Sequence, residues 1–491
     1  MRLSRFIALV ASVGLAAPAA AVTPHAMFGD HMVFQRNAPL PIWGTADPGE
    51  EIYVHLTVAT ADGKREEGKA VTAGKDGAWA VKLAAFPAGT DGVLTVKGTD
   101  KKDDKGKPVS GTLTFKDVLV GEVWICSGQS NMEWSLASSP KGGGPEAAKA
   151  STNPNLRLFT VPKHAAATPQ AGFLKTPNPQ DSKWLVSGPD TTPRFSAVAY
   201  FFGRDLQKAL GVPVGLIHTS WGGTPAEAWT STEALTADPT TKHYVEKGKA
   251  LAGNPNSPAS LYNGMIQPLL PFAVKGAIWY QGESNASRAI EYRTLFATMI
   301  EDWRKRWGSD LAFYAVQLAP FEAGNKDADS WAYLREAQAI ATAKVKNAGV
   351  AVITDVGDLK DIHPQKKEPV GVRLSLLARA QTYGEKVEDS GPAYKSLAVD
   401  GDKAVLTFDH IGGGLVAEGG DLKGFTVAGE DKVFHPAKAV IVGDTVVVTS
   451  GDVAKPVAVR FGWKNFPELN FFNKAGLPAS PFRTDTFPGG K

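Results

Sequence analysis

The spacing of apolar residues divides the chain into three parts. Short alternations of apolar and polar residues, separated by Gly, Pro and Asp, fill the first hundred residues, as in "EEIYVHLTV" and "GVLTVKG". The same period of two returns from about residue 390, as in "KAVLTFDHI" and "AKAVIVGDTVVVTS". Such alternation is typical of antiparallel β-structure. The pattern therefore predicts an N-terminal β domain over residues 22–115 and a C-terminal β domain over residues 389–491.

Between these parts, apolar strand-like runs alternate with helix-like segments. The helix-like segments are "SAVAYFFGRDLQKAL", "EYRTLFATMIEDWRKRW", "REAQAIATAKV" and "VGVRLSLLARAQTYG". The strand-like runs are Val118–Cys126, Val214–His218, Gly276–Tyr280, Ala312–Leu318 and Val350–Thr354. We therefore expect residues 116–388 to fold as a doubly wound α/β domain with a mostly parallel sheet. In such a sheet, ligands bind beyond the carboxyl ends of the strands.

The N-terminus has the features of a secretory signal peptide. Arg2 and Arg5 precede an apolar stretch from Phe6 to Ala17, and the small residues 19–21 follow it. The apolar stretch is shorter than the roughly 20 residues that a membrane span needs, and no later stretch is longer. We therefore expect residues 1–21 to be removed from an exported protein, periplasmic or secreted, that has no membrane span.

Composition narrows the function further. The 491 residues are 43% hydrophobic and 21% charged, as in a soluble globular protein of two to four domains. Removal of the signal peptide lowers the formal net charge from +3 to +1, which predicts no nucleic-acid partner. A single cysteine, Cys126, excludes an intramolecular disulfide. Its place inside an apolar run favours a buried thiol over a nucleophile.

Small and polar residues follow the ends of the expected central strands. They are Gly128 to Asn131, then "TSWGGT", "QGESNA" and "DVGDLKDIHP". A serine, a pair of glycines, side-chain amides and an Asp/His pair are the groups that acyl transfer needs. Imidazole removes the proton of the serine, a carboxylate orients the ring, and fixed N–H groups stabilise the oxyanion. This set predicts an esterase or a related acyl-transfer enzyme.

Within this set, Ser130 is a candidate nucleophile, with His363 as its base and Asp361 as the orienting acid. A helix cap is the alternative role for a serine in this position. The run "GESNA" approximates the G-x-S-x-G elbow, so Ser284 is a second candidate nucleophile. For His218, which closes an apolar strand, we expect a core position. The oxyanion donors are expected from Gly223 and from Gln281 or Asn285.

Four long segments carry a family resemblance. They are "GEVWICSGQSNMEW", "GLIHTSWGGTPAEAW", "IWYQGESNA" and "DIHPQKKEPVGVRLSLLAR". In this order they resemble the blocks of the SGNH (GDSL-type) hydrolase superfamily, in the form of the bacterial sialate O-acetylesterases and related carbohydrate acetylesterases. The segments "MFGDHMVFQRNAPLPIWGTADPGE" and "LNFFNKAGLPASPFRTD" resemble the flanking β regions of that family. The resemblance implies a three-layer αβα hydrolase domain between two β domains.

The resemblance also implies roles for individual residues. Ser130 is then the nucleophile and His363 the base, and the oxyanion hole comprises the Ser130 N–H, the glycine of "SWGG" and a polar side chain of "QGESN". The superfamily usually has Asp three residues before His, but Lys360 occupies that position here. We therefore assign the acid to Asp361, with Asp358 as the second choice. The usual Asn of the third block aligns with Gln281, Glu283 or Asn285, and Glu283 can also be a buried structural acid.

The expected reaction is removal of O-acetyl groups from a carbohydrate, either sialic acid or a plant polysaccharide such as xylan. We expect substrate contacts from Gln129, from aromatic rings and from a cation for a sialate carboxylate, for which Arg335 is the candidate. The rings are Trp134 and Trp221, with Trp229 and Trp279 as further strand-end aromatics. No cofactor is expected, and the candidate loops lack the ligand spacing of a catalytic metal. The competing functions are a carbohydrate-binding protein with an inert site and a lipase-like esterase for long acyl chains.

Overall fold

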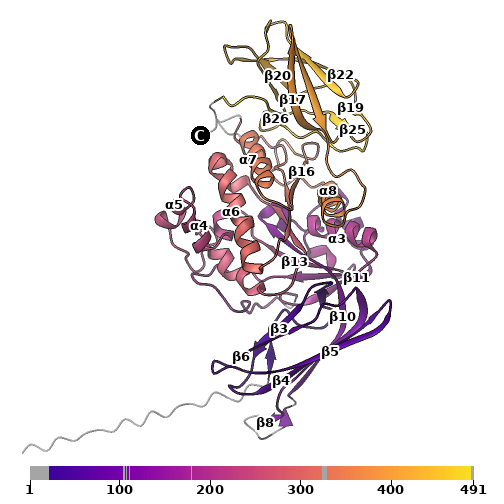
Figure 1. Cartoon of the computed structure of the whole chain (residues 1–491), viewed down its shortest axis with the longest axis vertical. Coiled ribbons are helices and arrows are strands. Elements are labelled where there is room, and N and C mark those ends of the chain that lie inside the picture. The colour runs from indigo at the N-terminus through magenta and orange to yellow at the C-terminus, as the bar shows by residue number, and fades with distance from the viewer. Residues whose placement is uncertain are drawn as a thin grey trace, which may run out of the picture.

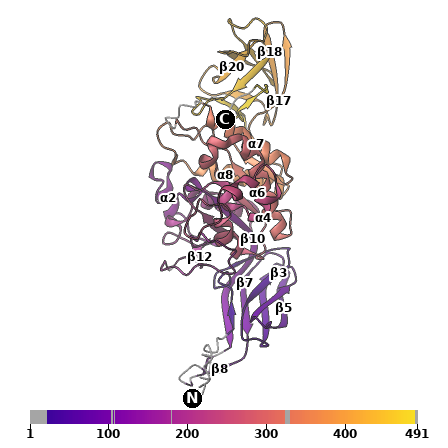
Figure 2. The same cartoon turned by 90° about the vertical axis from the view of Figure 1, so that its left-hand side faces the viewer.

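The structure is a computed structural model, which describes residues 22–487 except 103–105, 107, 110, 179 and 323–328. The expected signal peptide lies outside these residues. The molecule is elongated, with an α/β region in the middle and a β region at each end (Figures 1 and 2). None of the described helices is long and apolar enough to cross a membrane.

A seven-stranded path forms the middle of a large mixed sheet. Its strands lie in the order β12-β11-β13-β10-β14-β15-β16, and all neighbours are parallel except β12 and β11. The bounds are β10 Thr112–Gly128, β11 Asn153–Thr160, β12 Trp184–Ser187, β13 Val214–Ser220, β14 Gly276–Tyr280, β15 Ala312–Val316 and β16 Ala348–Ala351. The five predicted strands are present, although the last begins two residues earlier than predicted. Strands β11 and β12 were not predicted.

Helices cover both faces of this sheet. The four long helices are α3 (Ala197–Leu210), α6 (Ala289–Trp307), α7 (Ser330–Lys344) and α8 (Glu368–Leu377). Figure 1 shows α6 and α7 on one side of the strands and α3 and α8 on the other. The Trp124 ring of β10 packs edge-on against Phe202 of α3, whereas the Trp279 ring of β14 packs against Trp303 of α6. The alternation of side chains along the strands thus distributes the apolar residues to both faces of the sheet.

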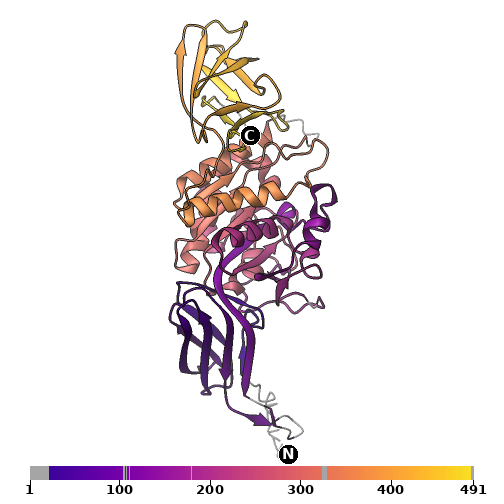
Figure 3. The same ribbon diagram turned by 90° about the vertical axis from the view of Figure 1, so that its right-hand side faces the viewer.

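The N-terminal β region is continuous with the central sheet. Strand β10 is 17 residues long; its first part pairs antiparallel with β7 (Gly89–Lys97), and its second part pairs with β13 and β14 (Figure 3). The remaining strands of this region are β1 Thr23–Pro24, β2 Val33–Gln35, β3 Leu40–Thr45, β4 Glu51–Thr60, β5 Gly63–Thr72 and β6 Ala78–Leu83, with the short pair β8 Lys101–Lys102 and β9 Pro108–Val109. One cluster of buried apolar residues extends through both regions.

The C-terminal β region has an apolar core of its own. One antiparallel sheet has the order β17-β18-β23-β22, and a second has the order β21-β20-β24-β26. The bounds are β17 Ala393–Asp400, β18 Lys403–Asp409, β20 Phe425–Ala428, β21 Phe434–Pro436, β22 Lys438–Val442, β23 Thr445–Thr449, β24 Ala458–Phe461 and β26 Phe482–Arg483, with β19 Leu415–Ala417 paired to β25 Phe471–Asn473. Phenylalanine rings fill this core, for example Phe425 and Phe461, whose ring centres are 4.7 Å apart.

Candidate active site

A cavity of about 660 Å³ lies at the carboxyl ends of the central strands. Ser130 lines it from the turn after β10, and His363 lines it from the loop before α8. Thr160 ends β11, Lys163 follows it, and Ser220 ends β13. The structure therefore brings the predicted serine and histidine into one cavity, at the edge of the sheet where ligands are expected.

The Ser130 turn depends on a glycine. Gly128 ends β10 with φ of +137°, and an added Cβ would lie 2.1 Å from the carbonyl oxygen of Tyr280 on β14. No larger residue fits between these two strands. The chain then turns at Gln129, and Ser130 begins the single-turn helix α1, Ser130–Glu133. Among the described residues no backbone acceptor faces the Ser130 N–H, so this donor is available to an oxyanion.

The glycine loop after β13 lies against this turn. A Cβ on Gly222 would be 3.3 Å from Cβ of Ser130, so only glycine allows this approach without displacement. The Gly222 N–H donates to Oε2 of Glu133 at 2.7 Å, and the other Glu133 oxygen pairs with Lys163 at 2.6 Å. Gly223 is exposed, and no acceptor for its N–H occurs in the described part of the chain. Of the two glycines, Gly223 is the one whose N–H has no acceptor in the described residues, and its place in the oxyanion hole stays a prediction.

His363 is oriented by stacking more than by a carboxylate. The indole of Trp134 stacks on the imidazole with ring centres 4.5 Å apart and an interplanar angle of 16°. The nearest Asp361 oxygen is 3.8 Å from Nδ1, too far for a hydrogen bond, and it accepts the backbone N–H of His363 at 2.8 Å. Burial and the positive charge of Lys367 lower the pKa of His363, and Asp361 opposes them. The lowered pKa favours the neutral imidazole, the form in which a histidine acts as a base.

Asp358, the second choice for the acid, shapes the loop instead. Its Oδ1 accepts the backbone N–H groups of Lys360 and Asp361 at 2.9 and 3.0 Å. These bonds lower the pKa of its exposed carboxyl group. The geometry fits a turn-forming aspartate.

The two amides predicted for the oxyanion hole point into the protein. Gln281 is fully buried and donates to the Thr224 carbonyl at 3.2 Å and to Oδ1 of Asn285 at 2.7 Å, which occupies both of its amide hydrogens. The Asn285 amide donates to Glu227 at 3.0 Å, and its oxygen accepts the Ala226 N–H. Neither residue lines the cavity. The structure corrects both assignments, because the hydrogen bonds of these side chains connect the loop after β14 to the glycine loop after β13.

Gln129 is also turned away from the cavity. It is buried, and its Oε1 accepts the backbone N–H groups of Gly282 and Ser284 at 3.2 and 3.3 Å. This correction makes Gln129 a link between two loops rather than a substrate contact. Ser284 has no place in the cavity lining, so the structure favours Ser130 of the two candidate nucleophiles.

Cys126 and His218 are both buried, but only His218 reaches the cavity. Cys126 is buried, as predicted, and burial raises its pKa well above the ordinary value. His218 is buried, with Nε2 2.6 Å from the Ser220 hydroxyl, and burial lowers its pKa to about 4. It nevertheless reaches the cavity wall, which its apolar strand did not predict.

Of the four tryptophans considered for sugar stacking, only Trp134 lines the cavity. Trp221 lies in the glycine loop after β13, and the ammonium of Lys163 is 5.3 Å from the centre of the Trp221 ring. Trp229 and Trp279 are fully buried and pack edge to face against each other. These two therefore belong to the core.

Arg335 does not bind a substrate carboxylate. It is fully buried on α7, and its guanidinium donates to the carbonyl oxygens of Gly462, Lys464 and Asn465 in the C-terminal region. Burial lowers its pKa to about 9. The expectation was wrong because an arginine in a helix sequence gives no sign of which segment covers it.

Two other cations line the cavity, and no pattern in the sequence pointed to them. Lys163 is paired with Glu133, as described above. Arg194 is exposed, and its side chain has neither a hydrogen bond nor an ion pair with any residue that the structure describes. Arg194 is therefore the cation that remains free for an anionic ligand.

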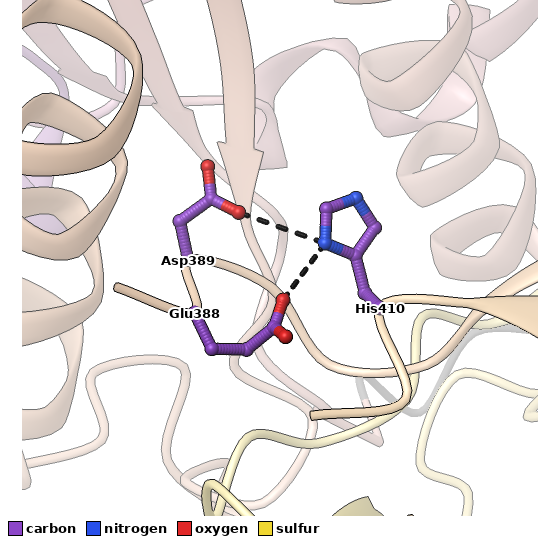
Figure 4. A group of neighbouring side chains, drawn as sticks. All are labelled: Glu388, Asp389 and His410. Carbon is purple, nitrogen blue, oxygen red and sulfur yellow. Dashed lines mark hydrogen bonds and ion pairs between the residues drawn. The ribbon is translucent and has the colours of Figure 1, made fainter. Parts of the chain in front are cut away.

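One group of potential metal ligands occurs among the described residues, outside the cavity. Glu388 and Asp389, which precede β17, face Nδ1 of His410, which follows β18 (Figure 4). The distances from Nδ1 are 2.9 Å to Glu388 and 3.7 Å to Asp389. These contacts join the segment that enters the C-terminal region to the end of its second strand.

The chain resembles proteins of known activity. Residues 120–370 match the family described as carbohydrate esterase, sialic acid-specific acetylesterase. Sialate O-acetylesterases of Pongo abelii and Homo sapiens are each 30% identical over 499 residues, which cover 93% of this chain and 92% of each relative. A crystal structure of a carbohydrate acetylesterase from Xanthomonas citri is 42% identical; the match covers 95% of this chain and 100% of that one, with a TM-score of 0.83.

Proposed function

The chain belongs to the sialic acid-specific acetylesterase family of carbohydrate esterases, and on this premise we propose how its cavity carries out the reaction. The protein is a carboxylic ester hydrolase that acts on O-acetyl groups of carbohydrates. Ser130 is the nucleophile and His363 the general base of an SGNH-type site. The observation that carries this assignment is that Ser130 and His363 line one cavity beyond β10, and that Ser284 does not.

The reaction proceeds in two halves. His363 takes the proton of the Ser130 hydroxyl as Oγ attacks the acetyl carbonyl carbon, and the N–H groups of Ser130 and Gly223 stabilise the oxyanion. The tetrahedral intermediate collapses, the bond to the sugar oxygen breaks, and His363 returns the proton to that oxygen. Water then attacks the acetyl-enzyme by the same route, and acetate leaves. Stacking on Trp134 holds the imidazole in place for both proton transfers, and Asp361 stabilises the imidazolium through space.

A covalent label tests the assignment of the nucleophile. We expect a fluorophosphonate to modify the protein once, and peptide mapping by mass spectrometry to locate the label on Ser130. Modification of Ser284 with Ser130 unmodified would reverse the assignment. The label depends on an activated serine, so the inert carbohydrate-binding alternative predicts no modification at all.

For the sugar, we propose an anionic one of the sialic acid type. The support is the unpaired guanidinium of Arg194 at the cavity wall, because a carboxylate forms charge-assisted bidentate hydrogen bonds with arginine. Acetate release from O-acetylated sialic acid and from acetylated xylo-oligosaccharides, compared at equal concentration, tests this choice. A preference for xylo-oligosaccharides would favour the alternative of a plant polysaccharide.

We also propose that the protein is exported after removal of residues 1–21, and that residues 116–388 form the catalytic unit. Arg2, Arg5 and the apolar stretch after them support export. Mass spectrometry of the protein from a native cell envelope or culture fluid is expected to give an N-terminus at Val22. An intact N-terminus at Met1 would contradict export by this route.

A further inference from the structure

A buried polar group lies directly behind the Ser130 turn. Asn131 follows Ser130, Glu283 follows β14, and Lys367 precedes α8. Asn131 is 1% exposed and Lys367 is 0% exposed. Nδ2 of Asn131 donates to Oε1 of Glu283 at 2.7 Å, and the Lys367 ammonium donates to Oδ1 of Asn131. None of the three side chains lines the cavity.

The charges fix the orientation of the Asn131 amide. Its oxygen faces a cation and its nitrogen faces an anion, so both contacts are charge-assisted hydrogen bonds. A flipped amide would place its NH₂ group against the ammonium and its oxygen against the carboxylate. In the described residues no direct ion pair joins Lys367 to Glu283, and Asn131 is the link between them.

The second hydrogen of the same amide reaches the histidine loop. Nδ2 of Asn131 also donates to the carbonyl oxygen of Ile362 at 3.0 Å, and Ile362 directly precedes His363. This bond connects the residue after the nucleophile to the residue before the base. Asp361 lies in the same loop as His363, so it cannot set the distance of that loop from Ser130. The Asn131 bond crosses between the two loops and, together with the Trp134 stacking, fixes this distance.

Stability alone does not account for this arrangement. Burial lowers the pKa of Lys367 to about 7 and raises the pKa of Glu283. Both shifts mean that the surroundings disfavour the charged forms. Well-packed apolar residues often replace buried ion pairs without loss of stability.

We propose that Asn131, Glu283 and Lys367 form one positioning unit, in which the two charged groups orient the Asn131 amide so that it holds the His363 loop against Ser130. The proposal rests on the catalytic roles given above to Ser130 and His363. The three residues touch no reacting atom, so their loss is expected to lower kcat and to leave KM within about twofold.

The sharpest test moves the negative charge from position 283 to position 131. In the double variant Asn131→Asp/Glu283→Gln, position 131 carries the carboxylate and position 283 the amide, so the net charge and the contact with Lys367 are kept. The Gln at 283 can donate to the Asp at 131, but the Asp cannot donate to the Ile362 carbonyl. We expect this variant to fold with an unchanged Tm and to lose about 10- to 100-fold in kcat, the size of effect that misplacement of a catalytic group by about 1 Å produces.

A second variant tests the effect of the positive charge of Lys367. Lys367→Met removes the ammonium, and Lys366→Met makes the same change at the exposed neighbouring position. The positive charge of Lys367 lowers the pKa of His363. We therefore expect the acidic limb of the kcat/KM profile to move to higher pH in Lys367→Met and to keep its position in Lys366→Met. The other charged or titratable groups at His363 and along the cavity wall are the same in both variants; they are Asp361, Glu133, Lys163, Asp181, Arg194 and His218.

Titration of active sites with the fluorophosphonate normalises kcat to folded enzyme in every variant. A wild-type kcat in the folded double variant, or an unmoved limb in Lys367→Met, would overturn the positioning unit and leave these residues a structural role. Failure of the catalytic assignment itself has a different signature, since Ser130→Ala would then remain active.

Discussion

The turn that carries Ser130 has a cavity side and a buried side, and their polar groups differ in one respect. On the cavity side, the N–H group of Ser130 and the guanidinium of Arg194 have no partner in the described structure, and neither has the N–H group of the exposed Gly223 in the adjacent loop. On the buried side, the amide hydrogens of Gln281 and Asn131 are all engaged. Free donors beside a cavity can respond to a substrate, whereas engaged donors can only hold the protein in one arrangement.

The same contrast applies to the two candidate nucleophiles. Both serines follow a central strand, and both lie at the start of a helical turn. Ser130 faces the cavity with His363, while the Ser284 backbone is held by Gln129 in the buried network. A strand end is therefore not sufficient for catalysis, since the loop must also turn its side chain toward the cavity.

The largest expected effect comes from Ser130→Ala. Loss of the nucleophile is expected to lower kcat by about 10⁴- to 10⁶-fold, the scale of triad removal, with Tm unchanged because the side chain has little buried contact. Hydrolysis of a chromogenic acetate ester measures this change. Ser284→Ala is the matched control and is expected to stay within about threefold of the wild type. An inactive Ser284→Ala with an active Ser130→Ala would make Ser284 the nucleophile instead of Ser130.

The next effect is on stability rather than on catalysis. Gln281→Leu removes the partner of the Thr224 carbonyl, the Asn285 amide oxygen and the Tyr292 hydroxyl, all on the buried side. The Asn285 oxygen keeps the Ala226 N–H, but the Thr224 carbonyl and the Tyr292 hydroxyl lose this partner. The loss is expected to lower the free energy of unfolding by about 3 kcal/mol, measured by urea denaturation.

Ser287→Ala, an exposed change in the helical turn that follows Gln281, is the control for Gln281→Leu and should leave the free energy of unfolding unchanged. The fraction of Gln281→Leu that remains folded should keep its kcat within about tenfold. A folded Gln281→Leu variant with kcat reduced a thousandfold would return Gln281 to the oxyanion hole.

Sequence reasoning located the strand ends well, because their signal is local. Val118–Cys126 is a continuous apolar run before Gly128, and such a run is typical of a strand buried on both faces. That rule placed Ser130 and His363 at one edge of the sheet. It could not show that Gln281 turns inward, because the direction of a side chain after a strand depends on loops that are distant in sequence.

The missed strand β11 has a physical reason too. Its sequence "NPNLRLFT" is interrupted by Arg157, which is buried because its guanidinium pairs with Asp117 at 2.7 Å. Arg157 interrupts the apolar run that predicts a strand, and Asp117, which pairs with it, is 40 residues away in the sequence. Trp134 was assigned to sugar binding for a similar reason, since the sequence does not reveal that His363 lies on its ring.

A smaller effect concerns Asp361, which acts on the histidine without a hydrogen bond to its ring. Burial and Lys367 place the pKa of His363 below 6.5, so the acidic limb of wild-type kcat/KM is expected below pH 6.5. Asp361→Asn removes the group that raises this pKa, so the limb should move further down, and kcat should fall by about tenfold as the imidazolium loses its support.

Asp358→Asn is the matched control for Asp361→Asn, because an amide oxygen can still accept the two backbone hydrogens that close the loop. Its pH profile should coincide with that of the wild type. A shifted limb in Asp358→Asn together with an unmoved limb in Asp361→Asn would transfer the role to Asp358. Unmoved limbs in both variants would leave a Ser-His dyad held by Trp134.

The smallest expected effect tests the free cation of the cavity side. Arg194→Gln keeps a hydrogen-bond donor but removes the charge, so kcat/KM for O-acetylated sialic acid should fall by about five- to tenfold, as for the loss of one exposed charge-assisted contact. The neutral xylo-oligosaccharide esters should be hydrolysed as before. Lys208→Gln removes one positive charge from an exposed position on α3 that does not line the cavity, and it controls for long-range attraction of an anion. An equal loss for both substrates in Arg194→Gln would mean that the guanidinium supports the cavity wall. Its role would then be structural, like that of the polar groups on the buried side.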